Sequence, residues 1–361
     1  MSIEKAKYKI GLHYFDNSNI FWYNKHYQKG GAFNMEEFKK MNLIQQRKMA
    51  IEELVIYYSE LRKFEFHQGK ELQYIELRKK IHFLVNFILK VDQLLSKENI
   101  IIIDDKHNTE NDKPRIYACT HIGGNDIQRT FQVIKEPAYL MLGDPGILYK
   151  KLIYKGLEMN GVIPLETTDK EDRKIAYSRA IELLNKGGNL LIYPEGAWNV
   201  SPNLVVMKIF TGTVRMAKET EAEIIPIAVE QYGQDFYFKI GSNYTVSANS
   251  KMNDKELTAD LRDKLATLKW EIMEHQPMLL RKDITPNYLE EFQKEIVDRC
   301  NYGYGFSLQD ALNESYHDKS ISTYLDVFSF LEKIEITSQN AFLEKDKQEY
   351  QMVKKIRKTV I

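Results

Sequence analysis

The chain has 361 residues, enough for one large domain with extensions or for two smaller ones. Its 51 basic and 51 acidic residues cancel, so no overall field favours nucleic acid as a partner. Two cysteines and an opening without an apolar signal-peptide core exclude a disulfide-built secreted scaffold and favour a cytoplasmic setting. No apolar stretch reaches the ~20 residues that a membrane-spanning helix needs.

Residues 1–98 are expected to form a helical N-terminal region. Within it, apolar residues recur three and four positions apart, which is typical of one face of a helix. They are Leu84, Phe87, Ile88, Val91, Leu94 and Leu95. Such a stripe is expected to pack on the rest of the protein, and a membrane surface or lipid tail is the alternative partner.

Residues 99–245 alternate between short apolar segments and helical ones, which predicts an α/β core with a mainly parallel central sheet flanked by helices. The expected strands are 99–103, 115–120, 138–142, 161–165, 189–193 and 223–229. A further segment, 236–240, is expected to add a strand at the edge of the sheet. The expected helices are 148–159, 171–186 and 213–221.

Residues 246–361 are expected to form a helical C-terminal region packed on the core. Helix 255–275 has its leucines on one stripe. The basic cluster at 354–358 is typical of a solvated helix face, with contact to anionic lipid as the alternative.

The segment His-Ile-Gly-Gly-Asn-Asp at 121–126 follows a predicted strand. A neutral imidazole can accept a proton, and a carboxylate on its other nitrogen can orient it. His121 is therefore a candidate base and Asp126 its partner. Gly123 and Gly124 allow a sharp turn close to a substrate, and Asn125 with Asp126 can cap the helix that follows.

The same spacing occurs once more, from His107 to Asp112, inside a run of polar residues that predicts an exposed loop. The strand before His121, and not the spacing, therefore distinguishes the candidate site. The segment Tyr-Pro-Glu-Gly at 193–196 also ends a strand. Because the carboxyl ends of parallel strands bind ligands in open α/β sheets, Glu195 and Gly196 are expected to share a crevice with His121.

The chain has no Gly-x-Ser-x-Gly nucleophile motif, and Cys119 is expected to be a small buried strand residue. We therefore expect direct transfer, in which His121 deprotonates an acceptor hydroxyl that attacks an activated acyl group. Backbone N–H groups at the start of the following helix are expected to hold the oxygen that becomes negative.

Over about residues 100–245 the chain resembles the lysophospholipid acyltransferase family, which includes the 1-acylglycerol-3-phosphate acyltransferases. The likeness lies in HIGGND at 121–126, PEG at 194–196 and Ile-Pro-Ile at 225–227. It implies an acyl-CoA or acyl-carrier-protein thioester as donor, no permanently bound cofactor and no metal. It also implies that His121 is the base, that Asp126 orients it, and that Glu195 and Gly196 shape the acceptor side.

Two arginines of the family pattern, which the resemblance associates with the acceptor's phosphate, are replaced by Thr167 and Trp198. Losing both guanidinium groups removes charge and paired donors. We therefore expect a neutral glycolipid or saccharide acceptor, with Trp198 as an aromatic platform. The remaining predicted substrate-binding residues are Gly123, Gly124, Asn125, Arg173 and Lys208.

Three alternatives stay open. The acceptor can be a 1-acylglycerol-3-phosphate, with Arg173 or Lys174 as the phosphate partner. The protein can be a lipid-binding protein without catalysis, or a metal hydrolase that uses His121, Asp126 and Glu195. The expected location is cytoplasmic, peripheral at the inner face of a membrane, with no nucleic-acid partner.

Overall fold

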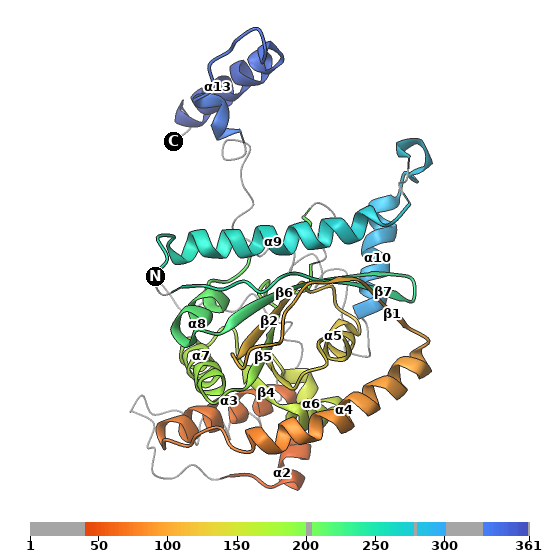
Figure 1. Cartoon of the computed structure of the whole chain (residues 1–361), viewed down its shortest axis with the longest axis vertical. Coiled ribbons are helices and arrows are strands. Elements are labelled where there is room, and N and C mark those ends of the chain that lie inside the picture. The colour runs from red at the N-terminus through yellow and green to blue at the C-terminus, as the bar shows by residue number, and fades with distance from the viewer. Residues whose placement is uncertain (1–39, 200–203, 248, 278–279, 301–327, 360–361) are drawn as a thin grey trace, which may run out of the picture.

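The computed structural model describes residues 40–199, 204–247, 249–277, 280–300 and 328–359, and residues 1–39 and 301–327 of the predicted helical regions lie outside them. A seven-stranded sheet has the order β1-β7-β6-β2-β5-β3-β4 (Figure 1). The strands β6, β2, β5, β3 and β4 are mutually parallel, whereas β7 runs antiparallel to β6 and parallel to β1. The predicted α/β class with a mainly parallel sheet is confirmed. The strands are β1 (Asn99–Asp105), β2 (Arg115–Cys119), β3 (Ala138–Gly143), β4 (Val162–Leu165), β5 (Asn189–Ile192), β6 (Glu223–Tyr232) and β7 (Asp235–Ile240).

The prediction that 236–240 lies at the edge of the sheet is wrong. After β6, a turn with Gly233 at φ 60° sends the chain back as β7, and β1 then pairs with the outer side of β7. Phe236 and Phe238 of β7 are fully buried as a result, whereas Ile101 and Ile102 of β1 are more than one third exposed. The edges of the sheet are therefore β1 and β4.

Helices cover both faces of the sheet because side chains alternate along each strand. On β2, Tyr117 and Cys119 face the layer of α5 (Asp126–Ile134), whereas Ile116 and Ala118 face the opposite layer. That opposite layer holds α7 (Lys170–Asn185), α8 (Gly212–Thr220) and α9 (Asp254–Glu274). The face of α5 also carries α4 (Ile75–Ser96) and α6 (Leu152–Asn160).

The other helices are peripheral. They are α2 (Leu43–Lys48), α3 (Ile51–His67), η2 (Gly146–Lys150), η3 (Arg281–Asp283), α10 (Tyr288–Cys300), η4 (Ser329–Glu332), η5 (Ala341–Leu343) and α13 (Glu344–Thr359). In Figure 1, η4, η5 and α13 form a small group that stands apart from the sheet. The division into 1–98, 99–245 and 246–361 stays a prediction.

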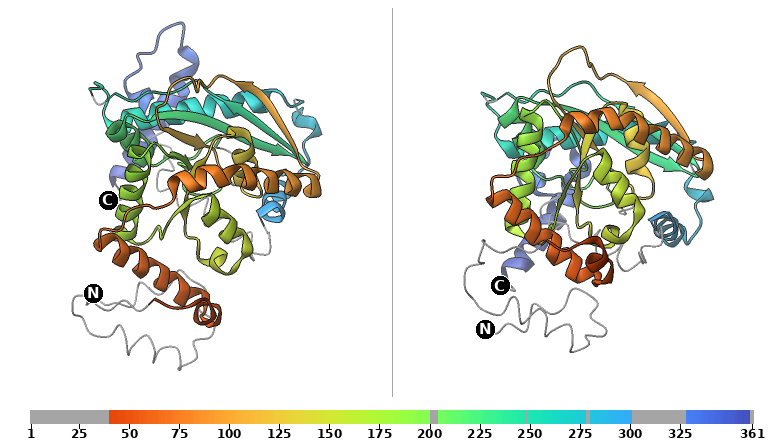
Figure 2. Two further views of the ribbon diagram at one scale, coloured as in Figure 1. Left: turned by 60° about the horizontal axis from the view of Figure 1, so that its bottom comes forward. Right: turned by 90° about the horizontal axis from the view of Figure 1, so that it is seen from below.

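Within the part of the chain that the structure describes, the apolar stripe of α4 is exposed and not packed, so the first expectation for it is wrong. All six predicted residues are exposed, from 41% at Val91 to 79% at Leu95, and Phe83 beside them is 76% exposed. The opposite side of α4 does the packing, because His82 lies there buried against Asn160. Figure 2 shows α4 lying across the outside of the α/β core. Among the described residues, no helix is both long and apolar enough to cross a bilayer.

Candidate active site at the ends of β2 and β5

The two signature segments meet because β2 and β5 are parallel neighbours. Ala118 of β2 pairs with Ile192 of β5, and His121 and Glu195 each come three residues later. The backbone N–H of His121 donates to Oε1 of Glu195 at 3.1 Å. The structure therefore brings these two residues together across 74 positions of sequence, as the parallel arrangement predicts.

Within the first segment, the imidazole and the carboxylate are in contact. Nδ1 of His121 lies 2.7 Å from Oδ2 of Asp126, whose side chain is buried while the His121 side chain is 13% exposed. The same oxygen accepts the N–H groups of Ile122 and Gly123 at 2.8 and 2.9 Å. A carboxylate held by two backbone donors can fix the tautomer and the orientation of the ring.

The expected capping role is wrong in detail. Asp126 binds N–H groups that precede it, and the Asn125 side chain donates to Glu98 instead of capping α5. The N–H groups of Ile122 and Gly123 are thus engaged by Asp126, so they are not donors for an oxyanion.

Two consecutive left-handed residues let the loop turn back within four positions. Gly123 has φ 83° and Gly124 has φ 64°, a region that only glycine adopts without strain. The turn brings the Asp126 carboxylate back beneath the N–H groups that precede it. The glycine pair therefore allows the contact between the His121 imidazole and the Asp126 carboxylate.

Glu195, which follows β5, holds the loop that begins at His121. Its side chain is buried, and its oxygens accept the N–H groups of His121 and Met207, the latter at 2.7 Å. Burial raises the pKa of the Glu195 carboxyl, while the charge of Lys269 and the two N–H donors oppose that rise. Both oxygens are used inside the protein, so the residue joins two segments of backbone.

We expect Glu195→Ala to destabilise the fold more than Glu195→Gln does. Alanine leaves both N–H groups unpaired, at about 1–3 kcal/mol each, whereas glutamine retains one acceptor oxygen. Urea unfolding measures both losses, and Glu76→Ala at a carboxylate that is 75% exposed is the matched control. Wild-type stability with reduced turnover would instead mean that Glu195 serves as a wall for substrate.

Gly196 and Lys208 follow directly after Glu195 and Met207, the two residues that this contact joins. Gly196 has φ 71°, and a Cβ there would come within 2.4 Å of the Phe210 ring, so any side chain would push that ring away. The N–H of Phe210 donates to the carbonyl of Pro194, which holds the following segment against the strand end. Lys208, next to Met207, is exposed.

Two aromatic rings surround His121. Tyr193 lies 4.2 Å from the imidazole centroid at an angle of 31°, and Trp198 lies 6.2 Å away with its plane at 74°. Trp198 also packs against Ile296 of α10. The predicted sugar platform is therefore in contact with both the candidate base and a helix from the C-terminal region.

Arg173 is placed differently from the other predicted residues. It donates to the carbonyl of Thr167, after β4. The strand β4 is three positions away from β2 in the sheet, and neighbouring strands are about 4.8 Å apart. The end of β4 therefore lies about 14 Å from the end of β2, where the His121 loop begins. Lys174 is exposed on the same helix.

Two sequence interpretations agree with the structure. His107 pairs with Asp105, not with Asp112, in a segment without helix or strand. Cys119 is fully buried and free, and burial raises the pKa of its thiol well above the usual range. Neither residue is placed for chemistry at the strand ends.

A buried ionic network, which was not predicted, lies behind the loop. Arg129 of α5 is fully buried, with Nε 2.6 Å from Glu98 and Nη2 2.8 Å from Asp92. Glu98 also accepts the Asn125 amide at 2.8 Å, so the network joins α4 to the candidate catalytic loop, residues 121–126. The available signal was one arginine on the otherwise buried face of a short helix.

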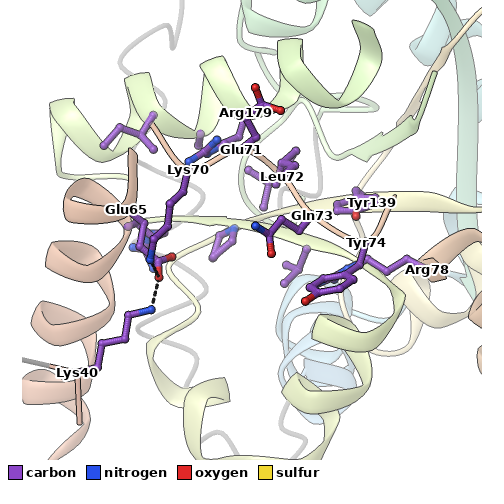
Figure 3. A pocket seen from close by; sticks show the side chains of 16 residues that line it. Lys40, Glu65, Lys70, Glu71, Leu72, Gln73, Tyr74, Arg78, Tyr139 and Arg179 are labelled. Carbon is purple, nitrogen blue, oxygen red and sulfur yellow. Dashed lines mark hydrogen bonds and ion pairs between the residues drawn. The ribbon is translucent and has the colours of Figure 1, made fainter. Parts of the chain in front are cut away.

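A separate cavity of about 460 Å³ lies at the other edge of the sheet, next to β4 (Figure 3). Its lining residues come from α3, α7, the segment between α3 and α4, and β4, and include Tyr139 and Arg78. Several of its cations face acids within the protein, as Lys40 and Lys70 do with Glu65. None of the predicted site residues lines it.

Comparison with known proteins shows a likeness to a family over the part of the chain that holds this site. Residues 100–230 match the family model described as Acyltransferase. This part of the chain is similar to the acyltransferase family. The acyltransferase domain so defined contains His121, Asp126 and Glu195, whereas α9, α10 and α4 lie outside it.

Similar proteins come from plants. Over 123 residues, 34% of this chain, the identity is 27% to the chloroplastic 1-acyl-sn-glycerol-3-phosphate acyltransferase LPAT1 of Arabidopsis thaliana. It is 26% over the same length to the chloroplastic 1-acyl-sn-glycerol-3-phosphate acyltransferase BAT2 of Brassica napus. The matches cover 33% and 35% of those proteins, so the chain spans about a third of the length of the curated relatives it matches.

A solved structure is also similar. The 1-acyl-sn-glycerophosphate (LPA) acyltransferase PlsC of Thermotoga maritima aligns with a TM-score of 0.46 and 14% identity. The alignment covers 63% of this chain and 100% of that one.

Proposed function

We propose that the acyltransferase domain moves an acyl group from a thioester to the free hydroxyl of a 1-acylglycerol-3-phosphate. The observation that carries the chemistry is the 2.7 Å contact between His121 Nδ1 and Asp126. The names of the plant relatives support the acceptor class, in place of the neutral glycolipid or saccharide expected from the sequence. The donor is the thioester of the acyl group with coenzyme A or with an acyl-carrier protein.

In this mechanism, Nδ1–H of His121 donates to Asp126, which leaves Nε2 to accept the hydroxyl proton. The acceptor oxygen then bonds to the thioester carbonyl carbon, and the tetrahedral intermediate collapses as the carbon–sulfur bond breaks. The imidazolium returns its proton to the leaving thiolate. Asp126 stabilises the imidazolium in between, so the cycle consumes neither the base nor its partner.

An acceptor assay tests this proposal directly. The purified chain is supplied with a long-chain acyl-CoA or acyl-carrier protein and with lysophosphatidate, 1-monoacylglycerol or a neutral glycolipid. We expect phosphatidate as the main product. Transfer to the glycolipid alone would favour the neutral acceptor that Thr167 and Trp198 suggest, and binding of lipid without any transfer would favour a non-catalytic lipid-binding protein.

Neither alternative class has a specific observation in its favour. A metal hydrolase would need the oxygens of Glu195 and Asp126, which bind backbone N–H groups and His121 in this structure. Among the described residues, no group of three His, Cys, Asp or Glu is arranged for a metal ion. Acyl transfer is therefore the function that we propose.

We further propose that α4 docks the chain on a membrane surface, where a lipid acceptor resides. Phe83, Phe87, Leu94 and Leu95 are 61–79% exposed on one side of this 22-residue helix. Contiguous exposed apolar surface of this kind suits the boundary between headgroups and acyl chains. The cytoplasmic location at the inner face of a membrane stays a prediction.

The double variant Phe87→Asp, Leu94→Asp is expected to bind vesicles at least tenfold more weakly, because it places two charges in the apolar boundary. Both side chains are exposed, so helix content by circular dichroism should not change. Phe342→Asp, Met352→Asp is the matched control, since these residues are 75% and 58% exposed elsewhere. Sedimentation with vesicles of mixed neutral and anionic phospholipid measures the effect, and equal losses in both variants would contradict the proposal.

A further inference from the structure

The helix α10 lies against the candidate catalytic loop, although it is outside the family match and begins 162 positions after the end of the loop. Its Phe292, Ile296 and Val297 form an apolar cluster with Trp198. At its last turn, Arg299 lies on Gly124, where a Cβ would come within 2.9 Å of the arginine Cγ. Figure 1 shows α10 beside α5, the helix that begins at Asp126. The helix therefore contacts both the tryptophan and the glycine turn that flank His121.

Two cations, Arg299 and Lys269, lie among carboxylates near this contact. Nη1 of Arg299 is 4.0 Å from Oε1 of Glu230, and Nζ of Lys269 is 3.3 Å from the other oxygen of the same carboxylate. Lys269 is buried, and its charge reaches Glu195. The second partner of Arg299 is Glu295 at 3.2 Å, but that carboxylate is 61% exposed and is therefore weakly held.

The arginine itself is well placed for an anion. Its side chain is 14% exposed, so a ligand reaches it while part of its hydration is already removed. A guanidinium presents a planar fork of donors that matches phosphate, and its pairs with phosphate are frequently bidentate. Because Glu295 is solvated, an incoming phosphate can displace it at small cost.

We infer that Arg299 binds the phosphate of the acceptor and so determines acceptor specificity, on a helix that docks on Trp198. This inference rests on the proposed function. It explains why a tryptophan can stand where the sequence comparison expected an arginine, because the indole anchors the helix that carries the cation. Gly124 completes the arrangement, since only the absence of a side chain lets Arg299 lie on the loop.

The other candidate cations are less suitable. Arg173 lies at the β4 end of the sheet, about 14 Å away by strand spacing, which exceeds the length of a glycerol phosphate. Lys208 is exposed and offers a strongly hydrated point charge without a fork. It serves as the competing variant in the test.

The experiment measures acylation kinetics with lysophosphatidate and with 1-monoacylglycerol, which lacks the phosphate, at a fixed acyl donor. We expect Arg299→Gln to raise the KM for lysophosphatidate by at least tenfold, with the KM for the donor and the turnover of 1-monoacylglycerol unchanged. Arg299→Lys should recover part of the loss. Lys294→Gln, which removes an exposed charge from the same helix, is the matched control.

Glu295→Gln separates phosphate binding from a merely structural ion pair. If Arg299 serves the helix through Glu295, removing either partner should have the same effect. If it serves the acceptor, Glu295→Gln should leave the KM for lysophosphatidate unchanged or lower it, because a competitor of the phosphate has gone.

The outcomes are distinguishable. A wild-type chain that does not acylate lysophosphatidate would overturn the proposed function and this inference with it. A wild-type chain that does, together with an unchanged KM in Arg299→Gln, would overturn the inference alone. A selective rise in KM in Lys208→Gln, without one in Arg299→Gln, would assign the phosphate to the other side of the site.

Discussion

His121→Ala is expected to lower kcat by about 100- to 10,000-fold, the range that a positioned proton transfer contributes. The substitution removes the group that accepts the hydroxyl proton and leaves the Asp126 carboxylate bound to its two backbone N–H groups. The KM for the acyl donor should change little. Steady-state release of free thiol, followed with acyl-CoA and lysophosphatidate, measures the loss.

Two further variants make this test specific. Asp126→Asn retains the shape of the side chain but can present an amide N–H to Nδ1 of His121, which favours the wrong tautomer of the imidazole. We therefore expect a loss of kcat of similar size. His107→Ala removes an imidazole that also contacts a carboxylate, and full activity is expected. His107 follows β1, which runs antiparallel to β2, so it lies at the opposite end of the sheet from His121. Turnover that survives in His121→Ala would remove the general base from the mechanism.

Arg129→Leu is expected to have the largest effect on stability, about 3–5 kcal/mol, because it leaves a buried carboxylate without its partner. Glu98 is 9% exposed and loses its 2.6 Å contact with the guanidinium, while Asp92 and Ser96 lose the donors that join α4 to α5. Urea unfolding, monitored by circular dichroism, measures the change. Activity should fall along with it, since Glu98 also holds Asn125 in the catalytic loop.

Two matched variants show whether the unpaired charge of Glu98 causes the loss of stability in Arg129→Leu. Arg129→Leu combined with Glu98→Leu removes the whole pair, and we expect it to recover much of the stability. Arg173→Leu changes an exposed arginine and should stay within about 0.5 kcal/mol of the wild type. If the double variant is less stable than Arg129→Leu, the unpaired Glu98 is not what destabilises the single variant.

Local patterns were enough to predict most of the sheet and part of the site. Runs of apolar residues indicated all seven strands, and a loop of two glycines between a histidine and an aspartate indicated a tight turn, which has φ 83° and 64°. The expectation that Glu195 meets His121 followed from a general property of parallel sheets, since equal offsets from paired residues lie side by side. Information of this kind is short-range or follows from a rule of topology.

Long-range contacts could not be predicted in the same way. The apolar stripe of α4 has the same periodicity whether a core or a membrane receives it, and only the position of the helix on the outside of the core distinguishes the two. The run of isoleucines in β1 looks buried, yet the hairpin of β6 and β7 leaves it at an edge. Neither outcome depends on the residues of the element itself.

The amino-acid order alone therefore determined the strands, the turn and the chemical character of His121 and Asp126, because those depend on neighbours within a few positions. The contacts of Arg129 with Glu98, of Glu195 with Met207 and of Arg299 with Gly124 exist only in the folded chain. They join segments 12 to 175 residues apart, and no periodicity links such pairs. Packing brings these residues together. It therefore determines that Glu195 binds two backbone N–H groups and that Arg299 lies on the loop of His121.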